Sequence, residues 1–376
     1  MKKKLLSMFM VASLIVTTLT GCGETGTEAD KEATVTEEKE AVEETEKHTE
    51  ETTEKIETEA GETVSDNAST EAEANQDAYT VAALKGPTSM GLVGMMYMTE
   101  GNDTEAAYEF VMETSADTLL PMVLKNEADI ALVPANVASV LYNKTLALEG
   151  EDNDIVVLDV NTLGVLYMVT GDTYISTMKD LEGKTIYLTG KGTTPDYVLN
   201  YLLAANDVKD VTLEYKSEAT EVAAVLAENP DAIGLLPQPF VTAACIQNEA
   251  LSIVIDMNKE WAAVQGEGGS SLVTGVTITT KGFIKEHSQV VEQFMAKHKS
   301  SIEYVNANPD EAAALVVQAG IVEKEPVAKK AIPNCNLSYL DKADMKQALS
   351  GYLEVLYNQN PESVGGALPQ DDFYYE

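Results

Sequence analysis

A strand–turn–helix pattern occurs twice in this chain, about a hundred residues apart, and it constrains the fold more than any other feature. In the first copy the apolar run Tyr79–Leu84 precedes Lys85-Gly86-Pro87-Thr88-Ser89-Met90-Gly91. Glycine and proline end the strand there, and Thr88 or Ser89 can cap the helix that follows. In the second copy Lys184–Leu188 precedes Gly190–Asp196, where a threonine, a proline and an aspartate suit the start of a helix.

A second pair of segments repeats at a similar separation. Asp129–Asn136 and Asp231–Pro239 each predict a strand, a turn broken by proline, and a helix. In open α/β sheets, ligands bind beyond the carboxyl ends of the strands. We therefore expect two similar lobes, each of which presents two turns to a shared cleft.

The first 21 residues predict a lipoprotein signal peptide. Lys2, Lys3 and Lys4 are followed by the apolar run Leu5–Leu19, which is short for a membrane span. Leu19-Thr20-Gly21-Cys22 resembles a bacterial lipobox, which implies cleavage before Cys22 and a lipid on its thiol. Two or three acyl chains would anchor the protein stably. An ordinary secretory signal with a chance cysteine is the alternative.

Residues 22–78 predict the lipidated cysteine and an acidic linker rich in Glu and Thr. Gly23–Ala78 contains 20 Asp or Glu, 4 Lys and no aromatic residue. Such a segment cannot bury enough apolar surface to offset the entropy lost on ordering. We expect a disordered tether, with an acidic tail that sequesters metal ions as the alternative.

The rest of the chain is also acidic and contains no arginine. The formal net charge of the whole chain is −37. Excess negative charge argues against nucleic acid as a partner. Without arginine, a planar bidentate clamp for carboxylate, sulfonate or phosphate is missing, which leaves Lys85 and Lys191 to hold an anion.

The order of predicted elements places lobe one in residues 79–168 and 274–376, and lobe two in residues 169–273. The chain then crosses between lobes twice, near Gly164–Thr170 and Leu272–Thr280, which is typical of a hinge. Predicted helices of lobe two are Thr194–Asn206, Ala219–Glu228 and Gln238–Asn248. We expect the helices Ser288–Asn306, Pro309–Ala319 and Lys342–Tyr357 to pack on lobe one.

Motifs for catalysis or metal binding are mostly absent from the sequence. His287 and His298 are expected as solvated histidines on or beside a helix, without carboxylates at metal-ligand spacing. Cys245 and Cys335 fall in different predicted lobes, so we expect two unpaired, buried cysteines. We predict no metal and no cofactor.

Together these residues resemble the extracytoplasmic solute-binding lipoproteins of ABC importers, in particular the group for nitrate, sulfonate, taurine and thiamine-pyrimidine precursors. The resemblance spans Tyr79–Glu376. Its motifs are Lys85–Gly91, Val133–Asn136, Leu181–Lys184, Leu236–Pro239, Thr280–Ile284 and Gly365–Tyr374. It implies an α/β, type II periplasmic-binding-protein fold with two crossover strands and a helical carboxyl-terminal segment on lobe one.

The resemblance also implies a monomer that is anchored by its lipid to the outer face of the bacterial cell membrane. Such a protein captures a small molecule and delivers it to ABC permease and ATPase subunits. The expected ligand-binding residues lie in the turns and at one crossing: Gly86, Pro87, Thr88, Ser89, Met90, Pro134, Asn136, Tyr167, Thr193, Thr194, Gln238 and Pro239.

The neutral hydroxyls and amides of these turns favour a small planar heterocycle over an anion such as a sulfonate. An aromatic pair drawn from Tyr97, Tyr167, Tyr197 and Trp261 could sandwich its ring, unless these residues belong to the core. Two other classes remain as alternatives: an enzyme on the same fold, related to pyrimidine synthases, and a surface sensor or adhesion lipoprotein.

Overall fold

The computed structural model describes residues 78–97, 106–147 and 150–376 of the chain. The predicted signal peptide, lipidation site and acidic linker lie outside the described residues. Within the described residues, no helix combines the length and apolarity needed to cross a membrane.

One sheet contains six strands in the order β11-β4-β10-β3-β1-β2. β1 is parallel to β2 and to β3, whereas β10 is antiparallel to both β3 and β4. β1 lies between β3 and the edge strand β2, and its Val81, Ala82 and Ala83 are fully buried, as the continuous apolar run predicts. The strands are β1 Tyr79–Leu84, β2 Tyr108–Glu113, β3 Ile130–Pro134, β4 Ile155–Leu163, β10 Val273–Thr280 and β11 Leu337–Leu340.

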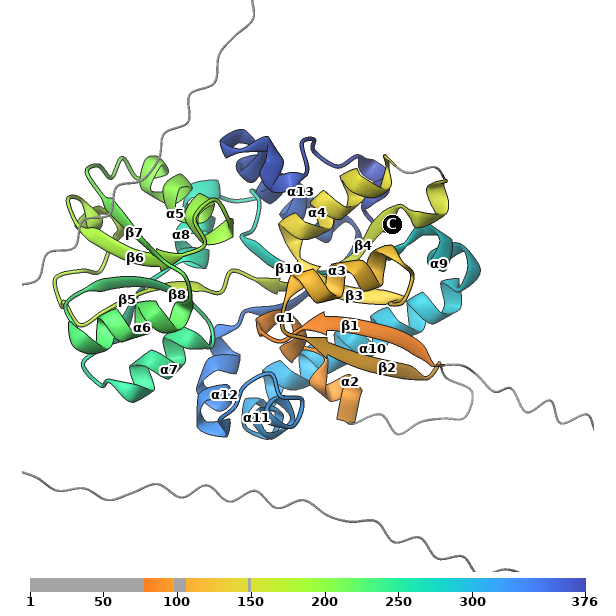
Figure 1. Cartoon of the computed structure of the whole chain (residues 1–376), viewed down its shortest axis with the longest axis horizontal. Coiled ribbons are helices and arrows are strands. Elements are labelled where there is room, and N and C mark those ends of the chain that lie inside the picture. The colour runs from red at the N-terminus through yellow and green to blue at the C-terminus, as the bar shows by residue number, and fades with distance from the viewer. Residues whose placement is uncertain (1–77, 98–105, 148–149) are drawn as a thin grey trace, which may run out of the picture. The chain divides into compact units, whose positions relative to one another are not determined.

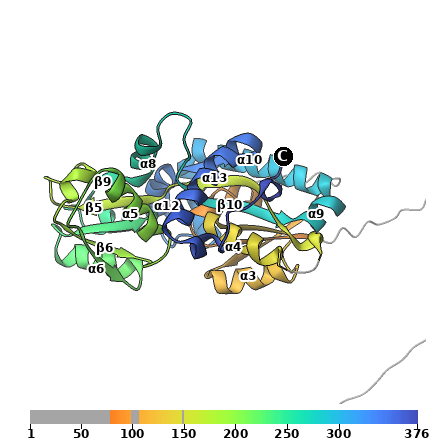
Figure 2. The same ribbon diagram turned by 90° about the horizontal axis from the view of Figure 1, so that it is seen from above.

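The second sheet contains five strands in the order β7-β6-β8-β5-β9. β6 is parallel to β7 and β8, and β5 is antiparallel to β8 and β9. Figure 2 shows this sheet at the left, together with the helices α5 Thr194–Ala205, α6 Ala219–Glu228 and α8 Met257–Gln265. The strands are β5 Leu166–Thr170, β6 Thr185–Thr189, β7 Thr212–Lys216, β8 Ile233–Pro237 and β9 Ser252–Asp256.

The chain passes between the two sheets at two points, as predicted. β4 ends at Leu163 and β5 begins at Leu166, so only two residues make the first crossing. A Cβ atom on Gly164 would lie 2.6 Å from Leu272 Cδ2, which precedes β10. The two crossings therefore pack against each other, and Gly164 permits the close approach. Below, lobe one is the part built on the six-stranded sheet and lobe two the part built on the five-stranded sheet.

Thirteen α-helices cover these sheets in the described residues. Most predicted helices agree with the structure to within one or two residues, but the prediction named no separate helix at α1, α8, α9 or α12. The helices are α1 Pro87–Met90, α2 Val93–Tyr97, α3 Ala116–Leu124, α4 Ala135–Thr145, α5 Thr194–Ala205, α6 Ala219–Glu228, α7 Phe240–Gln247, α8 Met257–Gln265, α9 Lys281–Glu286, α10 Ser288–Ala307, α11 Pro309–Gln318, α12 Glu325–Ala331 and α13 Lys342–Gln359.

The last long helix, α13, packs on lobe one as predicted and also on lobe two. It contacts α4, β4 and β10 in lobe one and α5 in lobe two, and Figure 1 shows it near both α4 and α5. Its Tyr352 lies 5.7 Å from Trp261 of α8, measured between ring centroids, and both side chains are fully buried. One hydrophobic cluster therefore runs through both sheets. Trp261 is a core residue, which corrects the expectation that it could sandwich a ligand.

Candidate functional site

The turn after β1 forms the short helix α1. Pro87 is its first residue, so Thr88 and Ser89 lie inside α1 and do not cap the following helix as predicted. Ser89 Oγ donates a hydrogen bond to Gly86 O over 3.1 Å and is fully buried. Ser89 thus stabilises the turn itself, because its hydroxyl is already paired within it.

α1 lies directly against the crossover strand β10. A Cβ atom on Gly275 would lie 2.4 Å from Thr88 Cγ2 and 2.5 Å from Asn161 Oδ1. Gly275 also pairs with Pro134 at the end of β3. The absence of a side chain at Gly275 therefore brings two predicted turns, those at Thr88 and Pro134, to the same crossover.

Residues 334–336 connect the α1 turn to the first crossing. Cys335 Sγ lies 3.5 Å from Met90 Sδ, and both side chains are buried. Tyr167 Oη, at the start of lobe two, donates to the backbone O of Asn334 over 2.7 Å. Asn336 Nδ2 donates to the backbone O of Gly164. Burial and the carboxylate of Asp256 raise the pKa of the Tyr167 phenol above its usual value.

Gln238 lies at the first crossing and carries an unpaired polar group. Its backbone N donates to Val165 O over 3.0 Å, and its Oε1 accepts from Thr242 Oγ1 over 2.7 Å. Its side chain is 1% exposed, and Nε2 has no hydrogen-bond partner. Burying an unpaired donor costs about 1–3 kcal/mol. Gln238 is followed by a cis peptide bond to Pro239, which precedes α7.

The turns that carry Asn136 and Thr193 also contact the carboxyl-terminal helix α13 or the segment after it. Asn136 Nδ2, on α4, donates to the backbone O of Ser363 over 3.3 Å. Thr193 is the residue before α5, and its Oγ1 donates to Gly190 O over 2.6 Å. Thr194 hydrogen-bonds the Tyr352 hydroxyl of α13, whose pKa burial raises to about 12.

The structure thus brings the predicted residues into two groups. Met90, Tyr167 and Gln238 gather around the first crossing with residues 334–336, whereas Asn136 and Thr194 both reach α13 or its continuation. Several of the twelve predicted side chains already form hydrogen bonds within the protein. Among the twelve, Gln238 is the residue with a buried donor, Nε2, that has no hydrogen-bond partner. That all twelve residues bind a ligand stays a prediction.

A pocket of about 310 Å³ lies between lobe two and lobe one beside Pro239. The wall from α7 is apolar except for Gln247, and the opposite wall is formed by the segment before α12 and by α12 itself. Phe240 and Ile246 expose about two-fifths of their surface here, although both are large apolar residues. The lining residues are Pro239, Phe240, Ala243, Ile246, Gln247, Ile321, Val322, Glu323, Lys324 and Val327.

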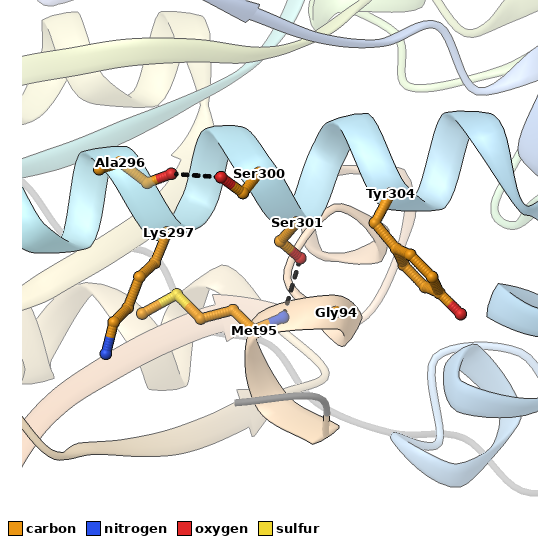
Figure 3. Close-up of a pocket in the computed structure, with 7 residues that line it drawn as sticks. All are labelled: Gly94, Met95, Ala296, Lys297, Ser300, Ser301 and Tyr304. Atoms are coloured by element: carbon orange, nitrogen blue, oxygen red, sulfur yellow. Dashed lines mark hydrogen bonds between the residues drawn. The ribbon is translucent and has the colours of Figure 1, made fainter. Parts of the chain in front are cut away.

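A second pocket, of about 340 Å³, lies between α2 and α10 (Figure 3). Ser301 Oγ accepts a hydrogen bond there from the backbone N of Met95 over 2.9 Å, and it also donates to the backbone O of Gly91. Lys297 and Tyr304 line the pocket on either side of these contacts. None of the twelve predicted ligand residues lines this pocket, so we do not assign the site to it.

His298 is fully buried, which corrects the expectation of a solvated histidine. Its Nδ1 lies 3.3 Å from Asp159 Oδ2, and Asp159 Oδ1 accepts from Thr277 Oγ1 over 2.8 Å. The pair joins α10 to both crossover strands. The sequence could have indicated this burial. Asp159 lies in an apolar strand, and a carboxylate buried there requires a polar partner such as His298.

His287 is only partly buried, and its Nδ1 lies 3.4 Å from Tyr79 Oη. Cys245 and Cys335 are both free, as predicted; Cys335 is buried and Cys245 only half-buried. Among the described residues, no group of three or more His, Cys, Asp or Glu side chains is placed to hold a metal ion.

The chain has a type II periplasmic-binding-protein fold, as predicted. Two mixed α/β sheets are joined by two short crossings, and candidate turns from both lobes lie near those crossings. The chain belongs to the NMT1/THI5-like family, whose model matches residues 112–312. No curated protein sequence matches this chain significantly.

Solved structures share the fold at low sequence identity. An ABC transporter protein from Parabacteroides distasonis is 23% identical, with a TM-score of 0.67, over 80% of this chain and 99% of that one. The periplasmic aliphatic sulphonate binding protein of Escherichia coli is 14% identical, with a TM-score of 0.61, over 80% of this chain and 92% of that one. The alkanesulfonate-binding protein of Xanthomonas axonopodis pv. citri, bound to MOPS, is 15% identical, with a TM-score of 0.54, over 79% and 96%.

Proposed function

We propose that this chain is the solute-binding component of an ABC import system, which captures a small molecule between its lobes. The single observation that carries the proposal is Gln238, a buried amide at the crossing whose Nε2 lacks a partner. In a protein of this family and fold, a donor held in that position suits a hydrogen-bond acceptor on a solute. The solute would then be passed to permease and ATPase subunits, while Cys22 holds the protein by lipid outside the cell.

Within this proposal, we infer that the solute is a small planar heterocycle. The candidate ligand side chains around the crossing are neutral: Tyr167 is a phenol of raised pKa, Gln238 is an amide, and Met90 and Thr88 are uncharged. The charge that acts on Tyr167 there is the carboxylate of Asp256, which would repel an anion. A buried neutral site disfavours an unpaired anion, because desolvation of the charge costs more than such groups repay. Since two proteins of similar fold are sulfonate binders by name, a sulfonate is the competing ligand class.

Calorimetry on the purified full-length chain tests both statements. The probes are 4-aminopyrimidines and short alkanesulfonates, each titrated at low and at moderate salt. We expect an aminopyrimidine to bind with little dependence on salt. Tight, salt-sensitive binding of a sulfonate alone would refute the heterocycle and leave the transport role intact. No binding by either class would count against solute capture as described.

Gln238→Met isolates the proposed contact. Methionine has a similar shape but no donor, so we expect the affinity for the heterocycle to fall about tenfold or more. Gln318→Met, on the exposed surface of α11, is the control and should not change the affinity. Equal affinities in the two variants would remove Gln238 from the site. Mass analysis of the recovered probe adds a test of the alternative class, since an enzyme related to pyrimidine synthases would alter it.

A further inference from the structure

The corner after α13 touches both lobes close to two of the predicted ligand turns. α13 ends at Gln359, and the short 3-10 helix η4, Pro361–Val364, follows. Asn360 between them donates from Nδ2 to Tyr197 Oη of α5 over 2.8 Å. Gln359 Nε2 donates to the backbone O of the same tyrosine over 3.0 Å. Two consecutive side chains of the carboxyl-terminal segment therefore bind one residue of lobe two.

On the lobe-two side, Tyr197 lies next to the turn that carries Thr193. A Cβ atom on Gly192 would lie 3.9 Å from Tyr197 Oη. The backbone N of Gly192 is also bound by Asp196 Oδ2 over 2.8 Å, and Asp196 is buried. The turn is thus bound to the first residues of α5. A contact that fixes the position of Tyr197 therefore also fixes the position of the turn.

On the lobe-one side, the same corner is fixed to α4. Asn136 Nδ2 donates to Ser363 O, and Ser139 Oγ donates to Val364 O over 2.7 Å. Asn143 Nδ2 also donates to Val364 O, over 2.9 Å. Gly365 has φ +91° and approaches the backbone of α4 so closely that a Cβ atom would lie 2.9 Å from Val140 Cα. Residues 360–365 are therefore held on lobe one by these contacts with α4.

These contacts form one continuous path between the lobes. It runs from the Gly192 turn through Tyr197 to Asn360, and then through Ser363 to Asn136. Within Asn360 the two polar atoms have separate partners: Nδ2 reaches Tyr197, and Oδ1 accepts from the backbone N of Glu362 over 3.2 Å. Oδ1 therefore stabilises the start of η4, whereas Nδ2 makes the contact between the lobes.

We propose that the Asn360–Tyr197 contact is an interlobe latch that sets the separation of the turns carrying Asn136 and Thr193. Asn360 and Tyr197 are positioning residues in this account, because they hold the turns and do not themselves contact the solute. The role of the latch in solute binding rests on the proposed function; the separation of the lobes does not.

The test measures the distance between spin labels on α4 and α5 in the full-length chain without solute. Lys144→Cys and Ala204→Cys are exposed positions on these helices. Cys22→Ala and Cys245→Ala remove competing thiols, and Cys335 is retained because burial raises the pKa of its thiol and keeps it unreactive. Pulsed electron paramagnetic resonance then reports the distribution of distances.

We expect a single narrow distance in the parent and an additional longer distance in Tyr197→Phe, which lacks only the hydroxyl. Tyr215→Phe is the matched control, since it loses one hydrogen bond, to Asp196, near the same turn but within lobe two. Asn360→Asp with Tyr197 intact should keep the parent distance, because its carboxylate can accept from the Tyr197 hydroxyl and from the backbone N of Glu362. An unchanged distribution in Tyr197→Phe, or an equal shift in Tyr215→Phe, would overturn the latch.

A second readout links the latch to the site. For a solute identified by calorimetry, Tyr197→Phe should weaken binding about two- to tenfold, the effect of one net hydrogen bond. Tyr215→Phe should leave the affinity within about twofold of the parent. Because the distance measurement uses no solute, failure to find a ligand would count against the proposed function alone.

Discussion

Tyr167 Oη donates a hydrogen bond to the backbone O of Asn334 across the first crossing, over 2.7 Å. Tyr167 is the second residue of β5 in lobe two, whereas Asn334 follows α12 in lobe one. The phenol that the sequence suggested for ligand contact therefore joins the lobes at the first crossing. Cys335, Met90 and Gln238 lie near the same crossing, so the candidate site and the crossing share residues.

Removal of this hydroxyl should weaken the contact across the first crossing without disturbing the core. We expect Tyr167→Phe to lower the free energy of unfolding by about 1 kcal/mol, the usual net value of a hydrogen bond. Urea unfolding of the purified protein measures the change. Tyr174→Phe, at a residue 87% exposed, is the control. A variant as stable as the parent would show that the 2.7 Å contact adds nothing to the folded state.

Gly275→Ala should displace α1 from β10. The new methyl group would lie 2.4 Å from Thr88 Cγ2 and 2.5 Å from Asn161 Oδ1, which is closer than real Cβ contacts. Overpacking of this kind costs about 1–3 kcal/mol. Thermal unfolding measures the loss of stability. Thr274→Ala on the same strand is the control for an alanine substitution in β10 without the clash at Gly275. If Gly275→Ala melts at the parent temperature, α1 is free to move away from the strand.

Alkaline pH should weaken the fold through Tyr142. Burial, the hydrogen bond to Asp372 and the charge of Asp372 raise the Tyr142 pKa to about 12. The unfolded phenol titrates near pH 10. The folded state thus holds this proton more tightly, so the stabilisation is complete below pH 10 and is lost as the pH rises towards 12.

The measurement is unfolding free energy against pH between 9 and 12. Tyr142→Phe should make the decline shallower in this range, whereas Tyr174→Phe should reproduce the parent curve. Equal slopes in all three proteins would mean that Tyr142 ionises as easily in the folded state as in the unfolded one.

The lipobox predicts that a lipid on Cys22, which lies outside the described residues, anchors the chain. We expect Cys22→Ser to abolish labelling of the protein by radioactive fatty acid in the producing cell. The variant should accumulate in the medium or as a precursor, with solute binding unchanged. Fatty-acid labelling that persists in the variant would contradict the lipobox.

The sequence predicted those elements whose burial is continuous or strictly patterned. β1 and β3 are apolar throughout because both faces are covered, and α10 has the spacing of a helix with one buried face. The crossings were also visible, since β10 is β-branched and follows a glycine-rich loop. Local composition determines each of these features.

Contacts between distant segments were not predictable in the same way. The placement of Asn334 beside Tyr167, and of Asn360 beside Tyr197, joins residues more than 160 positions apart. Single polar residues in a turn give no indication of such a partner. For the same reason Thr88 and Ser89 were expected as helix caps, whereas both lie within α1 and Thr88 packs against Gly275 of β10.

α13 also has a consequence for the order in which the protein can complete its fold. Tyr352 fills the space beside Trp261, and Leu349, Leu353 and Leu356 belong to the same cluster as the interior of lobe two. When a ribosome has synthesised all of lobe two, the helix that covers this interior is still untranslated. The middle of the polypeptide must therefore wait, with apolar surface uncovered, for the last residues of the chain.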